Sequence, residues 1–317
     1  MAFSVNTNAG AMAALQSLNA TNRTMETTQS RITTGLNVAS TKDDSAKYTV
    51  AQTLRGDLGK LNAVTSSLNN AKSVTDVAIA GAEQISDLVN QMKSKALEAS
   101  DAGLDQESRK AISNDLLALK KQINTVIEGS SFNGTNLLKG TPGTPAGTDA
   151  DGDPVAAVPG TGGKVSALQS ISDGSTLTVN NQGLSTAAAE AFGAAGTDTL
   201  ITNLQGDDVE GDPDAGTPVA AKGSFAADEL LGKLDTFFEE VKTSLSDLGA
   251  GSRQIEGQLS FNSNLSDVVT TGIGNLVDAD LAKESANLQA LQVQQQLGVQ
   301  ALSIANQSPQ TLLSLFR

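Results

Sequence analysis

Two stretches of the chain contain residues of the types that bind ions or phosphate. Three aspartates alternate with small residues, as in the first half of a calcium-binding loop: Asp149, Asp151 and Asp153. Gly160 stands where such a loop carries its bidentate Glu, so a solvated acidic turn fits better. Residues 160–164 are similar to a phosphate-binding loop, but Lys164 is followed by Val165 instead of Ser or Thr. We therefore expect no metal and no nucleotide cofactor.

The residue types that perform most enzyme chemistry are missing. The chain has no His, Cys or Trp, and Tyr48 is its only tyrosine. Without His there is no imidazole base, and without Cys there is neither a thiolate nucleophile nor a disulfide. The remaining carboxylates of the central region are scattered among loop-like residues. We therefore expect no catalytic residue and no enzyme activity, even in that region.

The negative charge of the chain is concentrated in one region. The net charge is -14, which argues against nucleic acid and anionic membranes as partners because a polyanion repels both. Residues 141–224 contain eleven acidic residues and two lysines. No apolar stretch approaches the ~20 residues that span a bilayer, and the first residues lack the basic start and apolar run of a Sec signal peptide. We expect no membrane insertion, and secretion only by another route.

The middle of the chain differs from its flanks. Six of the seven prolines lie between residues 141 and 224, together with Gly-rich runs. Because proline breaks helices, we expect no helix to run through this region. Segments such as residues 176–179 have the composition of short strands between turns. The sequence predicts a small β-containing domain that is inserted at residues 141–224 and exposed at the surface.

Both flanks of this insertion are almost free of proline, and their apolar residues recur at alternating spacings of three and four. This period is typical of coiled coils. It predicts a mainly α fold, in which a long antiparallel coiled coil or helical bundle is built from both termini. Residues 41–140 and 225–277 are expected to form a helical bundle rod, with these stripes: Leu54, Leu58, Leu61 and Leu68; Ile112, Leu116, Leu119, Ile123 and Val126; Leu234, Phe238, Val241, Leu245, Leu248, Ile255 and Leu259.

The two ends of the chain carry no charge. Residues 1–22 and 285–316 contain no Asp, Glu, Lys or Arg, although both are rich in Asn, Gln, Ser and Thr. An exposed helix normally carries charges for solubility, whereas an uncharged helix fits a place where charge would be desolvated. A flexible tail would explain one such end, but two matched ends favour burial among neighbours. We expect them to pair loosely or be disordered in the monomer and to fold upon assembly.

These ends, residues 1–40 and 278–317, are therefore predicted to polymerise. Identical surfaces that are not self-complementary generate an open helical polymer. Three charges next to the neutral helices, Arg31, Asp43 and Asp44, are expected to fix register through ion pairs within or between subunits. The predicted polymerisation interface consists of Leu15, Leu18, Met25, Ile32, Leu36, Leu288, Leu291, Leu297, Leu302, Leu313 and Leu315.

Both termini closely resemble the bacterial flagellins, the subunits of the flagellar filament. The resemblance covers roughly residues 1–140 and 225–317 and leaves the insertion unmatched. It lies in six segments: residues 4–8 (SVNTN), 31–46 (RITTGLNVASTKDDSA), 132–138 (FNGTNLL), 277–280 (VDAD), 305–310 (ANQSPQ) and 312–317 (LLSLFR).

The resemblance implies a structural subunit of the filament that serves motility. Such a subunit is secreted, is exported unfolded by the flagellar type III apparatus with its chaperone, and is added beneath the filament cap at the distal tip. Its terminal helices form the inner core of the filament. Implied partners are identical or sister flagellin subunits and the hook-filament junction proteins.

Flagellins that activate the innate Toll-like receptor carry an Arg-rich segment on the first bundle helix. Residues 91–95 (QMKSK) occupy the corresponding stretch and lack its leading Arg and following Leu. We therefore expect weak receptor activation.

Two alternatives to a filament subunit remain. A hook-filament junction protein shares the terminal helices, although residues 313–317 favour the filament. A secreted coiled-coil adhesin or translocator would use the helices as a stalk, which leaves the uncharged ends without a partner.

Overall fold

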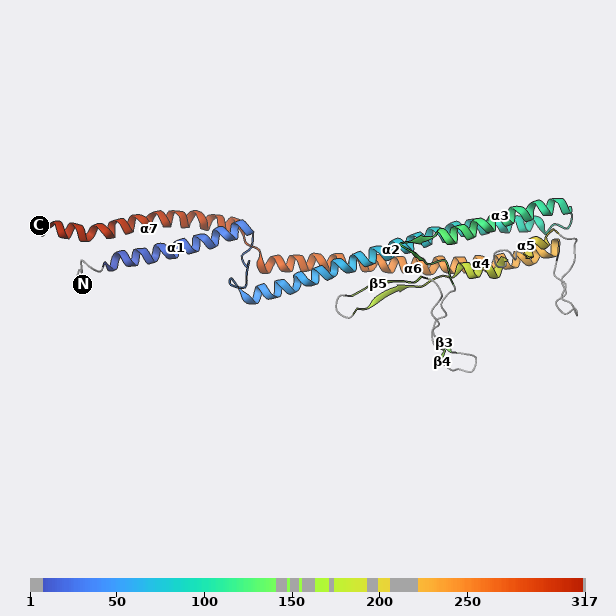
Figure 1. The fold of residues 1–317 in the computed structure, drawn as a ribbon, viewed down its shortest axis with the longest axis horizontal. Coiled ribbons are helices and arrows are strands. Elements are labelled where there is room, and N and C mark those ends of the chain that lie inside the picture. Colours follow the sequence, from blue (N-terminus) through green and yellow to red (C-terminus); the bar gives the residue numbers. More distant parts are fainter. Residues whose placement is uncertain are drawn as a thin grey trace. The chain divides into compact units, whose positions relative to one another are not determined.

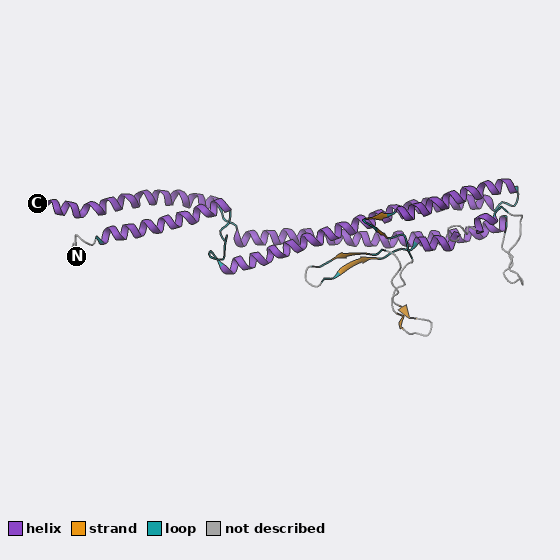
Figure 2. Ribbon diagram, in the orientation of Figure 1, coloured by secondary structure: helices purple, strands orange, loops and turns teal. Residues whose placement is uncertain are grey.

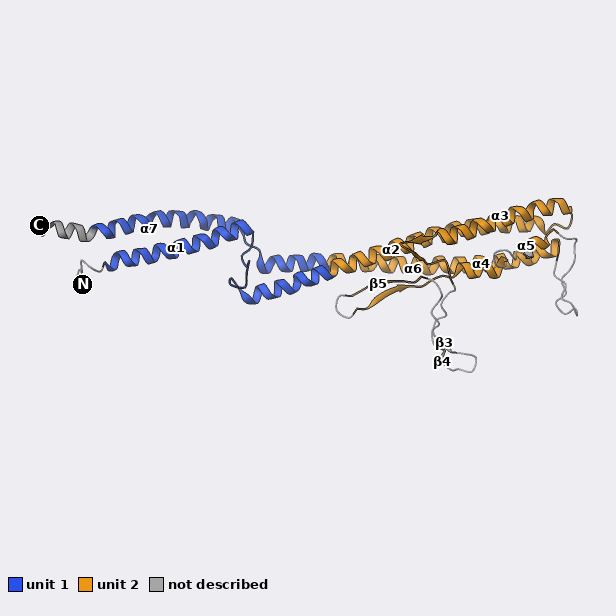
Figure 3. Cartoon of the chain, in the orientation of Figure 1, with its two compact units in different colours: residues 1–60, 265–317 blue, residues 61–264 orange. Residues whose placement is uncertain are grey.

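The computed structural model describes residues 8–140, 147–148, 154–155, 163–170, 174–192, 199–205 and 222–315. This part of the chain is mainly helical, with seven helices and three two-stranded antiparallel sheets (Figures 1 and 2). The chain divides into two compact units (Figure 3). Unit 1 comprises residues 1–60 and 265–317, and unit 2 comprises residues 61–264. The predicted mainly α fold with a small β-containing region is confirmed.

Unit 1 contains helices α1 (Ala9–Thr34) and α7 (Leu281–Leu315), the start of α2 (Ser45–Ala99) and the end of α6 (Ser224–Val277). Helix α1 begins where the Asn8 side chain accepts a hydrogen bond from the Ala11 amide at 3.0 Å. It ends at Gly35, whose φ of 72° favours glycine. Both ends thus carry residues suited to helix capping.

The residues that follow α1 are held against those that precede α7. Leu36 forms an antiparallel bridge with Asp278, and the amides of Asn37 and Val38 donate to the Val277 carbonyl. Val38 and Val277 are buried with Ala51 in a small apolar core. The turn between α1 and α2 is therefore fixed within unit 1 by backbone and apolar contacts.

Unit 2 is built on the antiparallel segments of α2 and α6, together with α3 (Gln106–Gly129). The direction follows from three cross-helix contacts: Leu61 O with Asn262 Nδ2, Lys72 with Glu256, and Lys93 with Asp235. Many residues of the predicted stripes are buried, at spacings of seven or of four and seven: Leu61 and Leu68; Ile112, Leu116 and Ile123; Leu234, Val241, Leu248 and Ile255. The other members of the three stripes are half-buried.

The strands form short hairpins. β1 (Ser131–Phe132) pairs with β2 (Thr135–Asn136) around a tight turn in which Asn133 and Gly134 have φ values of 50° and 78°. β3 (Gly147–Thr148) pairs with β4 (Pro154–Val155). β5 (Val165–Leu168) pairs with β6 (Thr176–Val179) in the register Val165↔Val179 to Leu168↔Thr176. The β5–β6 hairpin buries alternate side chains in the core of unit 2: Val165, Ala167, Leu177 and Val179.

The prediction that no helix lies between residues 141 and 224 is wrong. Helices α4 (Leu184–Phe192) and α5 (Thr199–Asn203) form there. No proline occurs between Pro159 and Pro213, and four of the nine residues of α4 are alanine, the best helix former. Leu184, Ala188 and Phe192 lie on one face of α4 and join the core of unit 2.

A close approach between α2 and the end of α3 yields a testable prediction. A Cβ at Gly81 would overlap Ser130 Oγ and would lie 3.0 Å from Leu138 Cδ1. We expect Gly81→Val to lower the free energy of unfolding by about 1–3 kcal/mol, because overpacking displaces side chains and backbone. Urea unfolding followed by circular dichroism measures this loss.

Gly232→Val is the matched control, because nothing lies within 4 Å of a Cβ at that helical position. It should stabilise the chain by a few tenths of a kcal/mol through helix propensity, roughly the difference between Val and Gly. Equal urea midpoints for the two variants would contradict the predicted overlap at Gly81.

Candidate functional site

Helices α1 and α7 lie side by side and antiparallel in unit 1 (Figure 1). Their least exposed residues recur at alternating spacings of three and four, which is the coiled-coil period. We call these residues the α1–α7 seam: Ala11, Ala14, Leu18, Thr21, Met25, Thr28 and Ile32 on α1; Glu284, Leu288, Leu291, Gln295, Gly298, Leu302 and Ala305 on α7.

Three polar contacts tie the seam together along its length. Asn8 Nδ2 donates to Ala305 O at 2.7 Å, and Gln295 Nε2 donates to Asn22 Oδ1 at 2.8 Å. Arg31 Nη1 lies 3.4 Å from Glu284 Oε1. Polar pairs at such positions specify register, because a shifted alignment would leave them without partners.

Six of the predicted interface residues meet at this seam: Leu18, Met25, Ile32, Leu288, Leu291 and Leu302. Leu36 is half-buried against the small apolar core of Val38, Ala51 and Val277. Leu15 and Leu297 lie outside the seam and are 48% and 58% exposed. The side chains of Leu313 and Leu315 lie outside the described residues.

The three predicted charges have different surroundings. Arg31 pairs with Glu284, a partner that the sequence analysis does not identify. Asp43 Oδ2 accepts hydrogen bonds from the amides of Ala39 and Ser40 and from Ser40 Oγ, and the bonds from Ser40 chiefly lower the pKa of Asp43. Asp44 caps α2, because its Oδ1 accepts from the Lys47 amide at 3.0 Å. That these charges fix register by ion pairing stays a prediction.

Glu284 has a recognisable signal in the sequence. It is the last charged residue before the charge-free stretch of residues 285–316, and it is only 9% exposed. A charged group is rarely buried without a partner, so its position already calls for a cation on the other terminal helix.

A cavity of about 250 Å³ lies next to the arginine. Arg31 Nε is buried and has no hydrogen-bond partner among the described residues, so one donor of this side chain is not used within the subunit. The cavity holds no group of metal ligands or nucleophiles that would perform chemistry, and the described part of the chain contains no cluster that could hold a metal. It is lined by Glu26, Thr27, Ser30, Arg31, Leu36, Asn37, Ala39 and Asp43.

The face of α7 that points away from the seam is apolar and exposed. Val293, Leu297 and Ile304 are four and seven residues apart, so they lie on one side of the helix. They are 56%, 58% and 70% exposed, and we call them the outer stripe of α7. A contiguous exposed apolar surface marks a site of interaction. The paired helices therefore present a further apolar, uncharged face for contact with other chains.

The Arg31–Glu284 pair supports a prediction about the seam. We expect Arg31→Ala to destabilise the α1–α7 pairing by about 1–2 kcal/mol, because the mostly buried Glu284 loses its charged partner while Arg31 itself is partly solvated. The measurement is hydrogen exchange of the α1 amides in the monomer. Arg23→Ala on the same helix is the control, because Arg23 is exposed and forms no ion pair with a described residue. Equal exchange in both variants would contradict the role of the pair.

Comparison with known proteins decides which family contains this pair of helices. The profile of the bacterial flagellin N-terminal helical region matches residues 5–142, and that of the C-terminal helical region matches residues 231–316. The chain belongs to the bacterial flagellin family. Flagellins are structural subunits of the extracellular flagellar filament that serves motility, and the chain is accordingly a filament subunit.

Similar sequences span almost the whole of this flagellin. Flagellin FljK of Caulobacter vibrioides is 40% identical over 314 residues, which are 99% of this chain and 98% of that protein. A flagellin of Brucella melitensis is 35% identical and covers 99% of both chains. The insertion that separates the two matched regions is therefore included in the alignment with these relatives.

A solved structure shares the fold of this flagellin at low sequence identity. A putative flagellar hook-associated protein of Vibrio parahaemolyticus aligns with a TM-score of 0.53 and 17% identity, over 74% of this chain and 100% of that one. Among the described residues, every helix is too short or too polar to cross a membrane. The predicted calcium-like aspartates and Gly160 lie outside the described residues.

Proposed function

We propose that this flagellin polymerises through α1 and α7, which form the inner core of the filament. The observation that carries this proposal is the pairing of two charge-free terminal helices around a thin seam that leaves the outer stripe of α7 exposed. In an aqueous monomer that stripe has no counterpart, whereas neighbouring subunits would cover it. The predicted residues Leu15 and Leu297 then contact neighbours, while the six seam residues hold the pair together.

Three regions have separate tasks in this proposal. Residues 1–40 and 278–317 form the inner core, and residues 41–140 and 225–277 form the rod. Residues 141–224 contribute the surface-exposed part of the subunit, which is supported by the acidity of this region and the absence of comparable charge at the ends. Arg31, Asp43 and Asp44 lie where the inner core and the rod join along the chain, and they hold the register there.

The assembly route follows from the family and from the weak pairing of the ends. The chain is exported unfolded by the flagellar type III apparatus with a chaperone and is added beneath the filament cap. Its partners are identical or sister flagellin subunits and the hook-filament junction proteins. It acts as a structural subunit and not as an enzyme. Marginal helices that fold only upon assembly would also remain easy to unfold for export.

Hydrogen exchange on the monomer and on seeded filaments tests this assignment. We expect the amides of α1 and α7 to become at least about 100-fold more protected in the filament, because burial among neighbours adds several kcal/mol to local opening. The amides of the unit 2 core should change little. Equal protection of α1 and α7 in both states would contradict the proposal.

The receptor prediction gains support from the surroundings of residues 91–95. Lys95 Nζ lies 3.2 Å from Glu98 Oε2 and 3.7 Å from Asp115 Oδ2, and the bond to Glu98 chiefly raises the pKa of Lys95. Lys93 pairs with Asp235. Both cations are thus engaged within the subunit.

We expect purified monomer to activate receptor reporter cells weakly. The double substitution Gln91→Arg and Lys95→Leu should increase the response at least about tenfold, which corresponds to ~1.4 kcal/mol of binding free energy. A potent response to the unmodified monomer would refute this prediction.

A further inference from the structure

Two asparagine side chains join three separate segments of unit 2. Asn181 follows β6 and is 6% exposed. Its Nδ2 donates to Asn136 O at 2.9 Å and Lys139 O at 2.8 Å, and it lies 3.3 Å from Gly163 O. Its Oδ1 accepts from the Gly183 amide at 2.8 Å. One buried amide thus contacts the chain before residue 141, the chain after residue 162, and its own turn.

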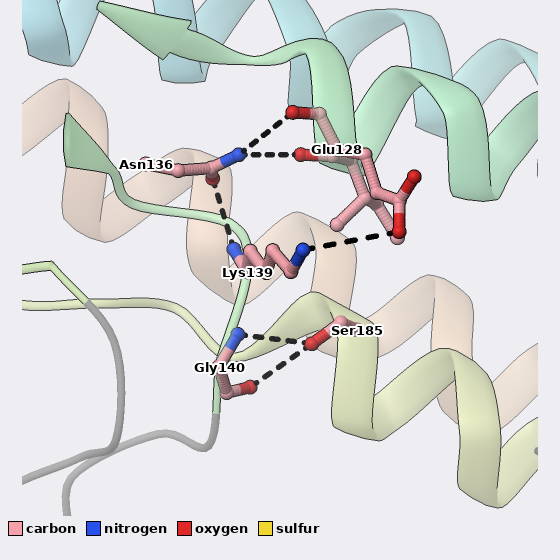
Figure 4. A network of polar contacts seen from close by, with 6 residues as sticks. Glu128, Asn136, Lys139, Gly140 and Ser185 are labelled. Carbon is pink, nitrogen blue, oxygen red and sulfur yellow. Dashed lines mark hydrogen bonds and ion pairs between the residues drawn. The ribbon is translucent and has the colours of Figure 1, made fainter. Parts of the chain in front are cut away.

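Asn136 holds the first of these segments against helix α3 (Figure 4). Its Nδ2 donates to Ile127 O at 2.6 Å and lies 3.4 Å from Glu128 O, both at the end of α3 where helix carbonyls lack intrahelical partners. Its Oδ1 accepts from the amides of Leu138 and Lys139. The side chain therefore continues the helix hydrogen bonding into residues 136–139.

Backbone contacts strengthen the same junction. The Gln182 amide donates to Leu137 O at 2.7 Å, and the Ser185 amide donates to Leu138 O at 3.2 Å. Gly140 N donates to Ser185 Oγ at 2.9 Å, as Figure 4 shows. The Lys139–Glu128 pair at the rim, 3.8 Å apart and well exposed, adds little stability. The junction is held mainly by neutral groups, so salt should affect it little.

The two ends of residues 141–162 are therefore held at one point. Lys139 O and Gly163 O both lie within hydrogen-bonding distance of the same Asn181 nitrogen. Gly163 lies so close to the junction that a Cβ there would be 2.9 Å from Thr135 Cγ2. Because the ends are fixed by described residues on both sides, the length of chain between them changes only the loop entropy, by about 0.6 kcal/mol per doubling.

We propose that Asn136 and Asn181 form a latch that separates residues 141–162 from the helical bundle, so that this position accepts a shorter segment or an added folded domain without disturbing assembly. Asn181 is the positioning residue of the latch. The latch itself is a property of the monomer, and only its consequence for assembly rests on the proposed function.

The first test compares Asn181→Asp with Asn180→Asp. A carboxylate at position 181 cannot donate, and it would place a buried negative charge among three carbonyl oxygens. We expect exchange of the Gln182 and Ser185 amides to accelerate at least about tenfold in Asn181→Asp, because several hydrogen bonds are lost together. Asn180 is exposed, and its side chain forms no hydrogen bond to a described residue, so its variant should exchange like the parent. Equal exchange in the two variants would overturn the latch.

The second test works even if Asn181→Asp fails to fold. Residues 142–161 are replaced by a short Gly-Ser linker, and separately by a small domain with adjacent termini, in the otherwise unchanged chain. Exchange of Gln182 and Ser185 in both monomers should stay within about twofold of the parent, and so should the rate of seeded growth. An acceleration of exchange above tenfold would overturn the proposal. Loss of growth with intact protection would instead contradict the surface role proposed for this region.

Discussion

Replacing Val293 and Leu297 together by aspartate is expected to abolish seeded filament growth. Both side chains are more than half exposed in the subunit, so the monomer should unfold at the same urea concentration as the parent. In the filament the same positions would be covered, and burying an unpaired charge costs several kcal/mol. A loss of this size corresponds to a decrease in growth rate of about 100-fold or more, since ~1.4 kcal/mol is a factor of ten.

The control for this variant keeps the apolar surface. Val293→Ile with Leu297→Met conserves volume approximately and should polymerise at nearly the parent rate, because such exchanges cost less than ~1.5 kcal/mol. Growth is followed by light scattering after addition of short filament fragments. Normal growth of the aspartate variant would show that the outer stripe of α7 faces solvent in the filament.

Replacing Phe237 by alanine is expected to have the largest effect on the monomer. Phe237 and Phe192 are almost fully buried, and their rings meet edge to face with centroids 5.3 Å apart. Removal of a buried Phe side chain costs about 3–5 kcal/mol because it also leaves a cavity. Phe261→Ala on the same helix is the control, since Phe261 is 59% exposed and its loss should cost less than ~1 kcal/mol in the monomer.

A double-mutant cycle with Phe192→Ala extends this test. We expect a coupling of about 0.5–1.5 kcal/mol between the two rings. Additive effects would show that α4 packs independently of α6. Because α4 is not predicted from the sequence, the cycle also checks its place in the core directly.

The helical core can be predicted because its signal is periodic. The stripes that include Leu68, Ile123 and Leu248 recur at coiled-coil spacing, and these three residues are buried as expected. Helix α4 escapes prediction because its burial depends on Phe237 and other residues far away in the chain, and periodicity within nine residues is a weak signal. Long helices thus announce themselves in the sequence, whereas a short helix needs the core that it joins.

The polar contacts of unit 2 cannot be predicted for a related reason. Asn262 is 2% exposed because its amide donates to Leu61 O and Thr65 Oγ1, almost 200 residues earlier in the chain. The carbonyl partners of Asn181 are likewise supplied by other segments. An amide that is buried and one that is solvated look the same in a sequence, since the partners decide which is stable.

The seam is predicted only in part. Leu18, Met25 and Ile32 lie on it, but Leu15 does not, because the other seam positions of α1 are small or polar residues that a search for apolar residues passes over. Two threonines are the buried residues of α1. Small side chains allow the close approach seen at Gly298, where a Cβ would lie 3.3 Å from Leu18 Cδ1. The charge-free composition of both ends is the more informative signal.

The most direct test of the central claim compares the intact chain with a variant that lacks residues 1–31 and 280–317. Both are seeded with short filament fragments and followed by light scattering and negative-stain electron microscopy. We expect long filaments from the intact chain alone, because the terminal helices supply the polymerising surface. Filaments from the shortened chain, or none from the intact chain, would contradict the claim that α1 and α7 drive assembly.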